Sequence, residues 1–539
     1  MRLILASPFA RSLTAVLVVS LAEVAGCSSG PAPGEEAAFY GAQLDASTRK
    51  ERTTAMTKIA ALKDIKGAMP FLYKALKSKN KDVRPKSAML VGKHGDASSV
   101  PALVDGLDFK ARSTATSEDK MAAVANERIA KALAKLGKGD DEKVVEALKK
   151  LMNMPQLEVQ LAGLQALGGL KAQSAIDDLI YVAEAHENNF MMKNAIIALG
   201  NLGNPKAVPV LMRNMFFERN VSFYIESSYS LFQLGKPSID PLLEVFHNKY
   251  EPIEDLHIEK GVQKAKAIQV LTDIGGDKRI EAVILEAAKI SPDDTANSLA
   301  RIWSQQQLGR LGLQAGKATL LSKWDDIDQS KSEHSLNGLV QLGAKDKAAG
   351  LLAMTTYNGF VRQCMKLDSR NKKSTCEAAS SQVRPARVLP ASRLAPGSSL
   401  KTFEQMLKEE KGRKDGKNKK LVKAIEEGIK RVQAAAECDG KGKACWVKML
   451  DDKEPLKRER AGYELLWLND KSTAEAQRKL LADKDNEVRF TGILYAWRTL
   501  DKEALPLIKE TLKKEKGKTQ YVRINQDLRR LVVKLERGY

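Results

Sequence analysis

The chain has 539 residues, which is too long for one ordinary hydrophobic core and excludes a single small domain. Hydrophobic residues make up 43%, charged residues 29% and aromatic residues only 5%, which is typical of a soluble folded protein rich in helices. Lysine and arginine number 88 against 67 acidic residues, so the formal net charge is +21. This charge indicates an affinity for polyanions or, since the charges are interspersed, simply solvated helix faces.

Residues 1–26 have the features of an export signal. A basic start precedes a short apolar run, Leu13–Ala22, that is too short to span a bilayer comfortably. The next stretch, Val24-Ala25-Gly26-Cys27, resembles the lipobox of bacterial lipoproteins, although Glu23 departs from that pattern. The resemblance implies cleavage before Cys27 and attachment of a lipid to its thiol. Ordinary secretory cleavage at the end of the apolar run, or an uncleaved anchor, are the alternatives.

Residues 27–45 are expected to form a flexible tether. Their first part is rich in serine, glycine and proline and shows no periodicity, which suits a segment that holds a domain away from a membrane. With an acylated Cys27, the protein would be anchored in the bacterial cell envelope, at its periplasmic or outer-membrane face.

One apolar pattern then returns along the chain, with apolar residues at i, i+3, i+4 and usually i+7, as on the buried face of a helix. A proline often follows the first apolar residue by one or two places, which suits the first turn of a helix. Another helix and a glycine turn precede each pattern. The patterns start at Met69, Val100, Val144, Ile176, Val208, Ile239, Ile280, Ala348 and Ala504. Spacings in the thirties predict an all-α fold, an α-solenoid of antiparallel helix pairs.

Two stretches of this pattern, Asp82–Leu107 and Asn486–Leu512, resemble HEAT repeats of the type found in phycobilisome lyases. Asp82-Val83-Arg84 and Glu487-Val488-Arg489 match the acidic-Val-Arg entry into the first helix of such a repeat. The resemblance implies a HEAT-like superhelix over residues 46–360 and a second helical or HEAT-like array over residues 401–539. Families with these repeats include scaffolds, adaptors and a few lyases.

Residues 361–400 are expected to form a basic, disulfide-containing loop or linker, because the repeat pattern fails there and proline, serine and arginine are frequent. Cys364 and Cys376 form one close pair of cysteines, and Cys438 and Cys445 form another. In an oxidising compartment these pairs favour two local disulfides, although four cysteines allow three pairings. A zinc site is the alternative, but the spacings are wider than those of zinc knuckles.

Motifs that carry chemistry are missing from the sequence. It has no glycine-rich phosphate loop, nucleophile elbow or metal-binding histidine pair, so no catalytic residue, metal or cofactor is expected. Two features are candidates for binding. One is an aromatic cluster, which could instead widen the core, and it contains Phe216, Phe217, Phe223 and Tyr224. The other is a basic segment, which could instead be a solvated loop, and it contains Arg370, Lys372 and Lys373.

These features together predict a membrane-anchored scaffold or adaptor that binds another, unidentified protein in the bacterial cell envelope. One alternative is a binder of anionic lipid or cell-wall polymer through the basic surface. A second alternative is an enzyme of the lyase-like repeat type. Nucleic acid is not an expected partner.

Overall fold

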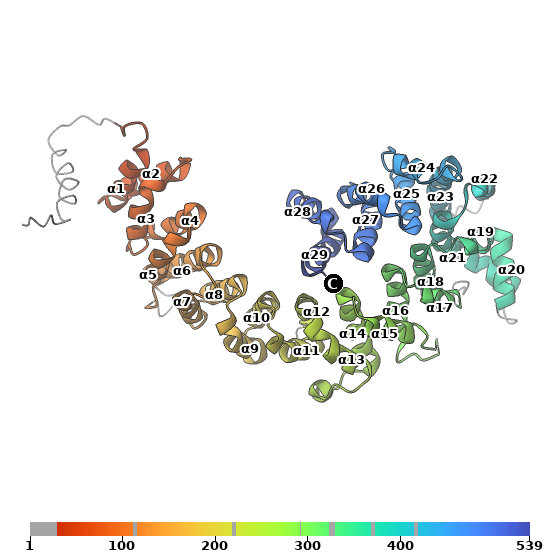
Figure 1. Cartoon of the computed structure of the whole chain (residues 1–539), viewed down its shortest axis with the longest axis horizontal. Helices are drawn as coiled ribbons and strands as arrows, with labels where there is room; N and C mark the ends of the chain where they lie inside the picture. Colours follow the sequence, from red (N-terminus) through yellow and green to blue (C-terminus); the bar gives the residue numbers. More distant parts are fainter. Residues whose placement is uncertain are drawn as a thin grey trace, which may run out of the picture. The chain divides into compact units, whose positions relative to one another are not determined.

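The computed structural model describes residues 30–110, 116–217, 222–291, 293–322, 329–367, 372–413 and 419–538; for residues 329–331 and 367 it describes the backbone alone. The described residues form helices joined by turns, which confirms the expected all-α class (Figure 1). Among the described helices, none combines the length and the apolar character that crossing a bilayer requires. Contacts divide the chain into two units, which are described separately below.

Unit 1 comprises the described residues up to Val182 together with His186–Ala198, so its boundary runs through α9 and α10. Its helices are α1 (Glu36–Ala42), α2 (Arg49–Ala61), α3 (Met69–Ala75), α4 (Arg84–His94), α5 (Val100–Asp105), α6 (Ser117–Leu136), α7 (Glu142–Met152), α8 (Leu157–Leu170), and the parts of α9 (Ile176–Ala185) and α10 (Asn189–Leu202) that fall within it. The flexible tether expected over residues 27–45 is therefore wrong in its later part, because Glu36–Ala42 forms a helix and Leu44 is buried.

Unit 2 comprises Ala183–Ala185 and Leu199–Tyr539. Its first helices are α11 (Val208–Phe216), α12 (Tyr224–Leu234), α13 (Ile239–Phe246), α14 (Lys260–Ile274), α15 (Lys278–Ala288), α16 (Ser298–Leu311), α17 (Lys317–Leu321), α18 (Gln329–Leu342), α19 (Ala348–Thr355) and α20 (Tyr357–Leu367). They are followed by α21 (Lys373–Leu394), α22 (Leu400–Gly412), α23 (Lys419–Cys438), α24 (Lys443–Met449), α25 (Pro455–Leu468), α26 (Ala474–Lys479), α27 (Asn486–Thr499), α28 (Leu505–Lys514) and α29 (Val522–Arg537).

The second helix of a pair starts in a repeated way. A short 3-10 turn, such as Ala97–Ser99 before α5 or Pro205–Ala207 before α11, leads directly into it. Pro101 and Pro209 then lie in the first turn of these helices, where the missing N–H costs no hydrogen bond. The recurring apolar–proline pattern is therefore the start of each second helix.

A buried arginine explains the acidic-Val-Arg motif. Arg84, near the start of α4, donates to the carbonyl oxygen of Gly106 and to Asp108, at 3.0 and 3.2 Å, just beyond the second helix of its pair. Arg489 at the start of α27 pairs in the same way with Glu515 beyond α28, at 2.8 Å. The motif thus ties the two ends of one helix pair together.

First helices of successive pairs stack closely through small residues. A Cβ added at Gly168 of α8 would lie 2.7 Å from the Cβ of Ala198 on α10, and one at Gly92 of α4 would lie 2.8 Å from the Cβ of Ala132 on α6. In unit 2, a Cβ added at Gly309 of α16 would lie 2.7 Å from the Cα of Gly338 on α18. Each such contact leaves no room for a larger residue.

The structure differs from the linker expected over residues 361–400. It contains α20 and the 22-residue helix α21, which continues through Pro385 and Pro390. The buried side of α21 follows helical spacing, but serine and arginine occupy part of it, so the apolar pattern fails there. Its buried residues on this stripe are Cys376, Ser380, Arg384, Arg387, Ala391 and Leu394.

Carboxylates from distant helices compensate the buried arginines of α21. Arg384 lies 2.7 Å from Glu410 of α22, and Arg393 donates to Glu459 of α25 at 2.6 Å. Glu459 also accepts from Arg431 of α23 at 2.8 Å and is fully buried. Although burial opposes it, Arg393 and Arg431 together hold the pKa of Glu459 below its usual value. These arginines belong to the core, not to a solvated loop.

The four cysteines of unit 2 lie in two close pairs. Sulfur atoms of Cys364 and Cys376 are 1.95 Å apart and connect α20 with α21, while those of Cys438 and Cys445 are 1.98 Å apart and connect α23 with α24. This is the local pairing among the three that four cysteines allow.

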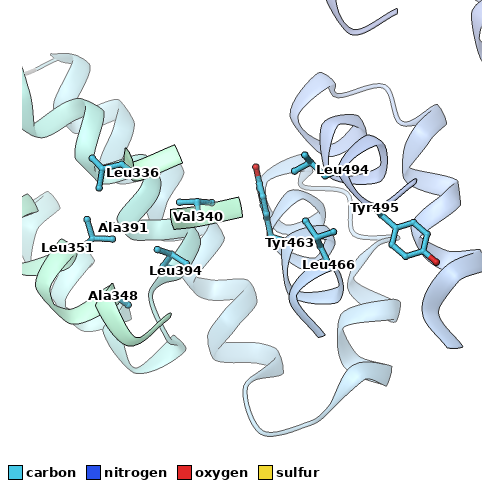
Figure 2. Close-up of a cluster of buried hydrophobic side chains, with 10 residues drawn as sticks. All are labelled: Leu336, Val340, Ala348, Leu351, Ala391, Leu394, Tyr463, Leu466, Leu494 and Tyr495. Atoms are coloured by element: carbon cyan, nitrogen blue, oxygen red, sulfur yellow. The ribbon is translucent and has the colours of Figure 1, made fainter. Parts of the chain in front are cut away.

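The last helices of unit 2 pack against its earlier ones, so residues 401–539 are not a separate array. A buried apolar cluster joins α18, α19 and α21 to α25 and α27 (Figure 2). Its residues are Leu336, Val340, Ala348, Leu351, Ala391, Leu394, Tyr463, Leu466, Leu494 and Tyr495. The apolar stripes of the returning helices are thereby covered by helices that lie about 70 to 160 residues earlier in the chain.

Three glycines allow the returning helices α25, α27 and α29 to approach the ends of the earlier helices; we call this the return contact. Gly275, Gly312 and Gly343 follow α14, α16 and α18, and each has a positive φ. A Cβ there would lie 2.8 Å from Lys534 Nζ, 3.2 Å from Arg498 Nε and 2.7 Å from Trp467 Cγ, respectively. The glycines let side chains of α29, α27 and α25 reach the last carbonyl groups of α14, α16 and α18.

Candidate functional site

The aromatic cluster expected to bind a partner is largely part of the core. Phe216 and Phe223 are buried, and Phe217 and Tyr224 are half-buried. The Tyr224 hydroxyl donates to Gln269 Oε1 on α14. Burial, reinforced by Asp273, raises the pKa of Tyr224 well above its usual value. The cluster therefore widens the core between helix pairs, which was the alternative left open by the sequence.

The remaining predicted site residues do not form a common site. Lys372 and Lys373 are exposed at the start of α21, and Lys373 lies 3.9 Å from Glu377 on the same helix. Arg370 and the expected lipidation residue Cys27 lie outside the described residues. Structural contacts do not bring these lysines to the aromatic residues.

Unit 1 instead presents exposed apolar side chains on α4, α6 and α10, three of its stacked first helices. Met89, Val124, Phe190 and Ile197 are 49, 40, 65 and 38% exposed. Hydrogen bonds bridge neighbouring helices of this layer: Lys135 of α6 donates to the last carbonyl groups of α4, and Gln165 of α8 donates to Asn194 of α10 at 2.9 Å. We call this surface the first-helix face of unit 1.

Lysines give the first-helix face a positive charge. Lys93 and Lys135 are exposed on α4 and α6, while Lys131, also exposed on α6, pairs with Glu127 of the same helix. Partial burial, followed by the charges of Lys93 and Lys135, lowers the pKa of His94 at the end of α4. The two lysines thus add to the effect of burial, as nearby like charges do. Scattered exposed apolar residues are common on soluble proteins, but four on one helix layer, flanked by lysines, form a candidate docking surface.

Unit 2 contains a cavity of about 770 Å³, here called the unit 2 cavity. One wall consists of α14, α16 and α18, and the opposite wall consists of α25, α27 and α29, with Arg393 of α21 between them. The returning helices α25, α27 and α29 contact the C-terminal ends of α18, α16 and α14. The two walls are separated beyond this contact, and the cavity lies between them.

Carboxamides dominate the cavity lining. On the first wall lie Gln269, Gln306, Gln307, Asn337 and Gln341, and on the second lie Asn486 and Gln526. Three of them are tied to protein groups: Gln269 to Tyr224, Gln306 to His334 and Asn486 to the carbonyl oxygen of Gln520. No partner within the described part of the chain satisfies the side chains of the other four, and the Oε1 atoms of Gln307 and Gln341 are buried.

The charged groups of the cavity are mostly compensated. Arg310 lies 3.5 Å from Asp527, Arg530 lies 3.1 Å from Asp273, and Arg393 donates to Glu487 at 2.8 Å as well as to Glu459. Arg523 is exposed and forms no ion pair with any residue that the structure describes. The half-buried ring of Phe490 and the side chain of Ile524 supply the apolar part of the lining.

Neither the first-helix face nor the cavity was a predicted site. The first was detectable in principle, because Phe190 and Ile197 are spaced by seven on a helix whose opposite side is also apolar. The cavity was not, since its walls are about 120 to 260 residues apart in the chain. Within the described ranges, no group of three or more histidine, cysteine or acidic side chains is placed to hold a metal ion.

A match to a family model agrees with HEAT-like helix pairs in one part of the chain. A family model described as HEAT repeats matches residues 145–215, from α7 to α11. Importin beta in an ammonium sulfate condition is similar in structure over 92% of this chain and 71% of its own, with a TM-score of 0.46 and 13% identity. The Kap95:Nup1 complex is similar over 90% of this chain and 69% of its own, with a TM-score of 0.46 and 13% identity. No curated protein sequence matches the chain.

Proposed function

We propose that this protein is a lipid-anchored adaptor of the bacterial cell envelope, which binds an acidic partner protein through the first-helix face of unit 1. The observation that carries the proposal is the gathering of Met89, Val124, Phe190 and Ile197, all exposed, on one layer of stacked helices. A stack of helix pairs provides a long rigid surface for binding, and no chemistry-bearing motif favours an enzyme.

Charge complementarity favours an acidic partner. The lysines beside the apolar residues would repel a basic surface, while carboxylates on a partner would speed association and fix its orientation. The apolar side chains would supply the desolvated centre of the interface, with the lysines at its rim.

The anchor rests on the sequence. The lipobox-like stretch that ends at Cys27 and the serine-, glycine- and proline-rich residues directly after it support a protein held at a membrane. The two cysteine pairs at disulfide distance suit an oxidising compartment such as the periplasm. Both the lipobox-like stretch and the cysteine pairs are compatible with export, and together they support the cell envelope as the location of the protein.

Replacing Cys27 by serine tests the anchor. The altered protein should appear in the soluble fraction of cells, and the N-terminal peptide of the unaltered protein should carry the mass of a lipid. Membrane retention of the Cys27→Ser variant, or an unmodified mature N-terminus, would contradict the anchor and leave the docking surface to be judged separately.

Photocrosslinking tests the docking surface. A photoreactive amino acid placed at Met89 or Ile197 should capture the same partner from intact cells. Placed at Tyr181, which is 69% exposed on the second helix α9, it should not, and Tyr181 is thus the matched control. With the purified partner, Ile197→Glu and Lys93→Glu should each weaken binding by about tenfold or more, and Tyr181→Glu should leave it unchanged.

The salt dependence separates the alternatives. Binding to the protein partner should weaken only modestly when salt rises, because salt screens the rim lysines but not the apolar contacts, whereas a polyanion would be released steeply. Capture of a cell-wall polymer or anionic lipid in place of a protein would favour the alternative function. Equal capture from Tyr181 and Ile197 would contradict the assignment of the face.

A further inference from the structure

We propose that the unit 2 cavity binds a neutral saccharide. This inference goes beyond the adaptor function, since it concerns a different unit and different residues, and either can fail without the other. It rests on the chemistry of the lining, on the compensation of the charges and on the size of the cavity.

The unpaired carboxamides match the hydrogen-bonding chemistry of sugar hydroxyl groups. A carboxamide carries both donors and an acceptor, and a hydroxyl group both donates and accepts, so the two pair in either direction. Gln307, Asn337, Gln341 and Gln526 have no partner of this kind among the described residues, although they lie in one cavity. Buried polar atoms are usually satisfied, so the buried, unpaired Oε1 atoms of Gln307 and Gln341, with half-buried Asn337 and exposed Gln526 beside the same space, indicate a ligand with several hydroxyl groups.

The same helices show what carboxamides do when they serve the fold. Gln306 lies against His334 on the neighbouring helix, and in unit 1 Gln165 bonds to Asn194 across the helix layer. A structural role would therefore predict similar pairs among the four. Their absence within the described residues separates these side chains from the ones that hold helices together.

The ion pairs favour a neutral ligand over an anionic one. Arg310, Arg393 and Arg530 each face a carboxylate at 3.5 Å or less, which compensates their charge, although Arg310 Nη2 and Arg530 Nε make no hydrogen bond within the described residues. Arg523 has no ion pair among the described residues, but it is exposed and solvated. A phosphate or sulfate group would have to compete with these carboxylates and be repelled by them. Hydroxyl groups can accept from the guanidinium N–H groups that the carboxylates leave unused.

Size and shape agree with a sugar of one to a few rings. The cavity volume of about 770 Å³ falls in the range of roughly 300–1,000 Å³ that is typical of sites for small molecules. The Phe490 ring offers an apolar surface for the C–H face of a sugar ring. A peptide would also use carboxamides, but the walls show no exposed sheet edge or apolar groove for its side chains.

Calorimetric titration of the purified full-length protein with named probes tests the proposal. N-acetylglucosamine, chitotriose and maltotriose are the neutral saccharides, glucuronic acid is the anionic probe and tri-alanine is the peptide probe. At least one neutral saccharide should bind, and it should bind more tightly than glucuronic acid and tri-alanine.

Variants locate the binding to the cavity. Gln307→Leu and Gln341→Leu should each raise the dissociation constant of the saccharide about tenfold, the loss expected for a buried hydrogen bond. Their folding should be unchanged by circular dichroism, because neither side chain has an internal partner. Gln160→Leu, a half-buried glutamine on α8 of unit 1, is the matched control and should bind like the unaltered protein.

The titrations and the variants together decide whether the unit 2 cavity binds a saccharide. Saccharide binding that both cavity variants weaken and the control does not would support the proposal. Binding of no neutral saccharide, tighter binding of glucuronic acid or tri-alanine, or saccharide binding that the cavity variants leave unchanged would each overturn it.

Discussion

At the scale of single residues, the most unusual feature is a cation buried against the end of a helix. Lys534 of α29 is buried and donates to the carbonyl oxygens of Asp273 and Ile274, at 3.3 and 2.7 Å. A cation is favoured at a helix C-terminus, because the last carbonyl groups have no partner within the helix. Burial nevertheless lowers the pKa of Lys534 to about 8. The charge of Asp273 opposes this shift, and the nearby Arg310 adds to it.

This lowered pKa predicts a rise of stability at alkaline pH. Above pH 8 the folded protein loses the Lys534 proton, while the unfolded chain keeps it up to its ordinary pKa of 10.5. The unfolded state then binds more protons, so the free energy of unfolding should rise between these values by up to about 3 kcal/mol. Below pH 8 both states are protonated and the contribution is constant.

Urea unfolding of the unaltered protein and of Lys534→Met between pH 7 and pH 10 measures this effect. The difference between the two free energies should grow with pH in favour of the unaltered protein. Lys513→Met, at an exposed position on α28, is the control and should follow the unaltered protein. Parallel curves for Lys534→Met and the unaltered protein would show that the buried amine does not titrate there.

At the scale of helices, two adjacent glycines of α8 separate packing from helix propensity. A Cβ at Gly168 would lie 2.7 Å from the Cα and the Cβ of Ala198, whereas a Cβ at Gly169 would meet no atom within 4 Å. Both positions have ordinary helical conformations, so only the neighbouring helix distinguishes them.

Gly168→Ala should therefore lower the free energy of unfolding by about 1–3 kcal/mol, the usual cost of overpacking. Gly169→Ala should raise it by about 0.5–1 kcal/mol, because alanine loses less backbone entropy in a helix. Thermal unfolding of both variants checks that the two substitutions change the free energy of unfolding in opposite directions. Equal effects of the two substitutions would mean that α8 and α10 are not in close contact.

At the scale of the molecule, the return of α25, α27 and α29 shapes unit 2. Trp467, Arg498 and Lys534 each donate to carbonyl groups at the ends of α18, α16 and α14. Arg498 also donates to the carbonyl oxygen of Gln341 at 3.0 Å, so one side chain serves two helices. Burial lowers the pKa of Arg498, whose side chain is half-buried in this contact, to about 10.

Arg498→Met should open this contact on both sides. Several carbonyl groups would lose their donor, and the unit should be destabilised by about 3 kcal/mol. Hydrogen exchange should become faster at the ends of α16 and α18 as well as in α27, although more than 150 residues separate them. Arg529→Met, exposed on α29, is the control. Faster exchange in α27 alone would show that the return contact does not couple these helices.

Much of the fold was predictable from local patterns. The apolar spacing, the prolines of the second helices and the glycine turns each report a local conformation, so they define helix pairs without knowledge of the partners. The same reasoning failed for α21, because Arg384, Arg387 and Ser380 occupy buried positions that an apolar pattern cannot reveal.

The candidate sites were less accessible to such reasoning. Phe216 and Phe223 attracted attention as aromatic residues in a chain with few of them, yet they are buried in the core. Exposure depends on which helix covers which face, and a single sequence does not state it. Phe190 and Ile197 became candidates only once the structure showed their side chains to be exposed.

By itself, the sequence determined the helix-pair repeat, its helical class and the features on which the proposed lipid anchor rests, because these depend on residues near one another in the chain. Only the tertiary structure decided that the arginines of α21 are buried and that the last helices return to the ends of α14, α16 and α18. Only it decided, too, that unpaired carboxamides surround one cavity. The physical reason is that ion pairs such as Arg393–Glu459 and caps such as Lys534 on α14 join residues 66 to 260 positions apart.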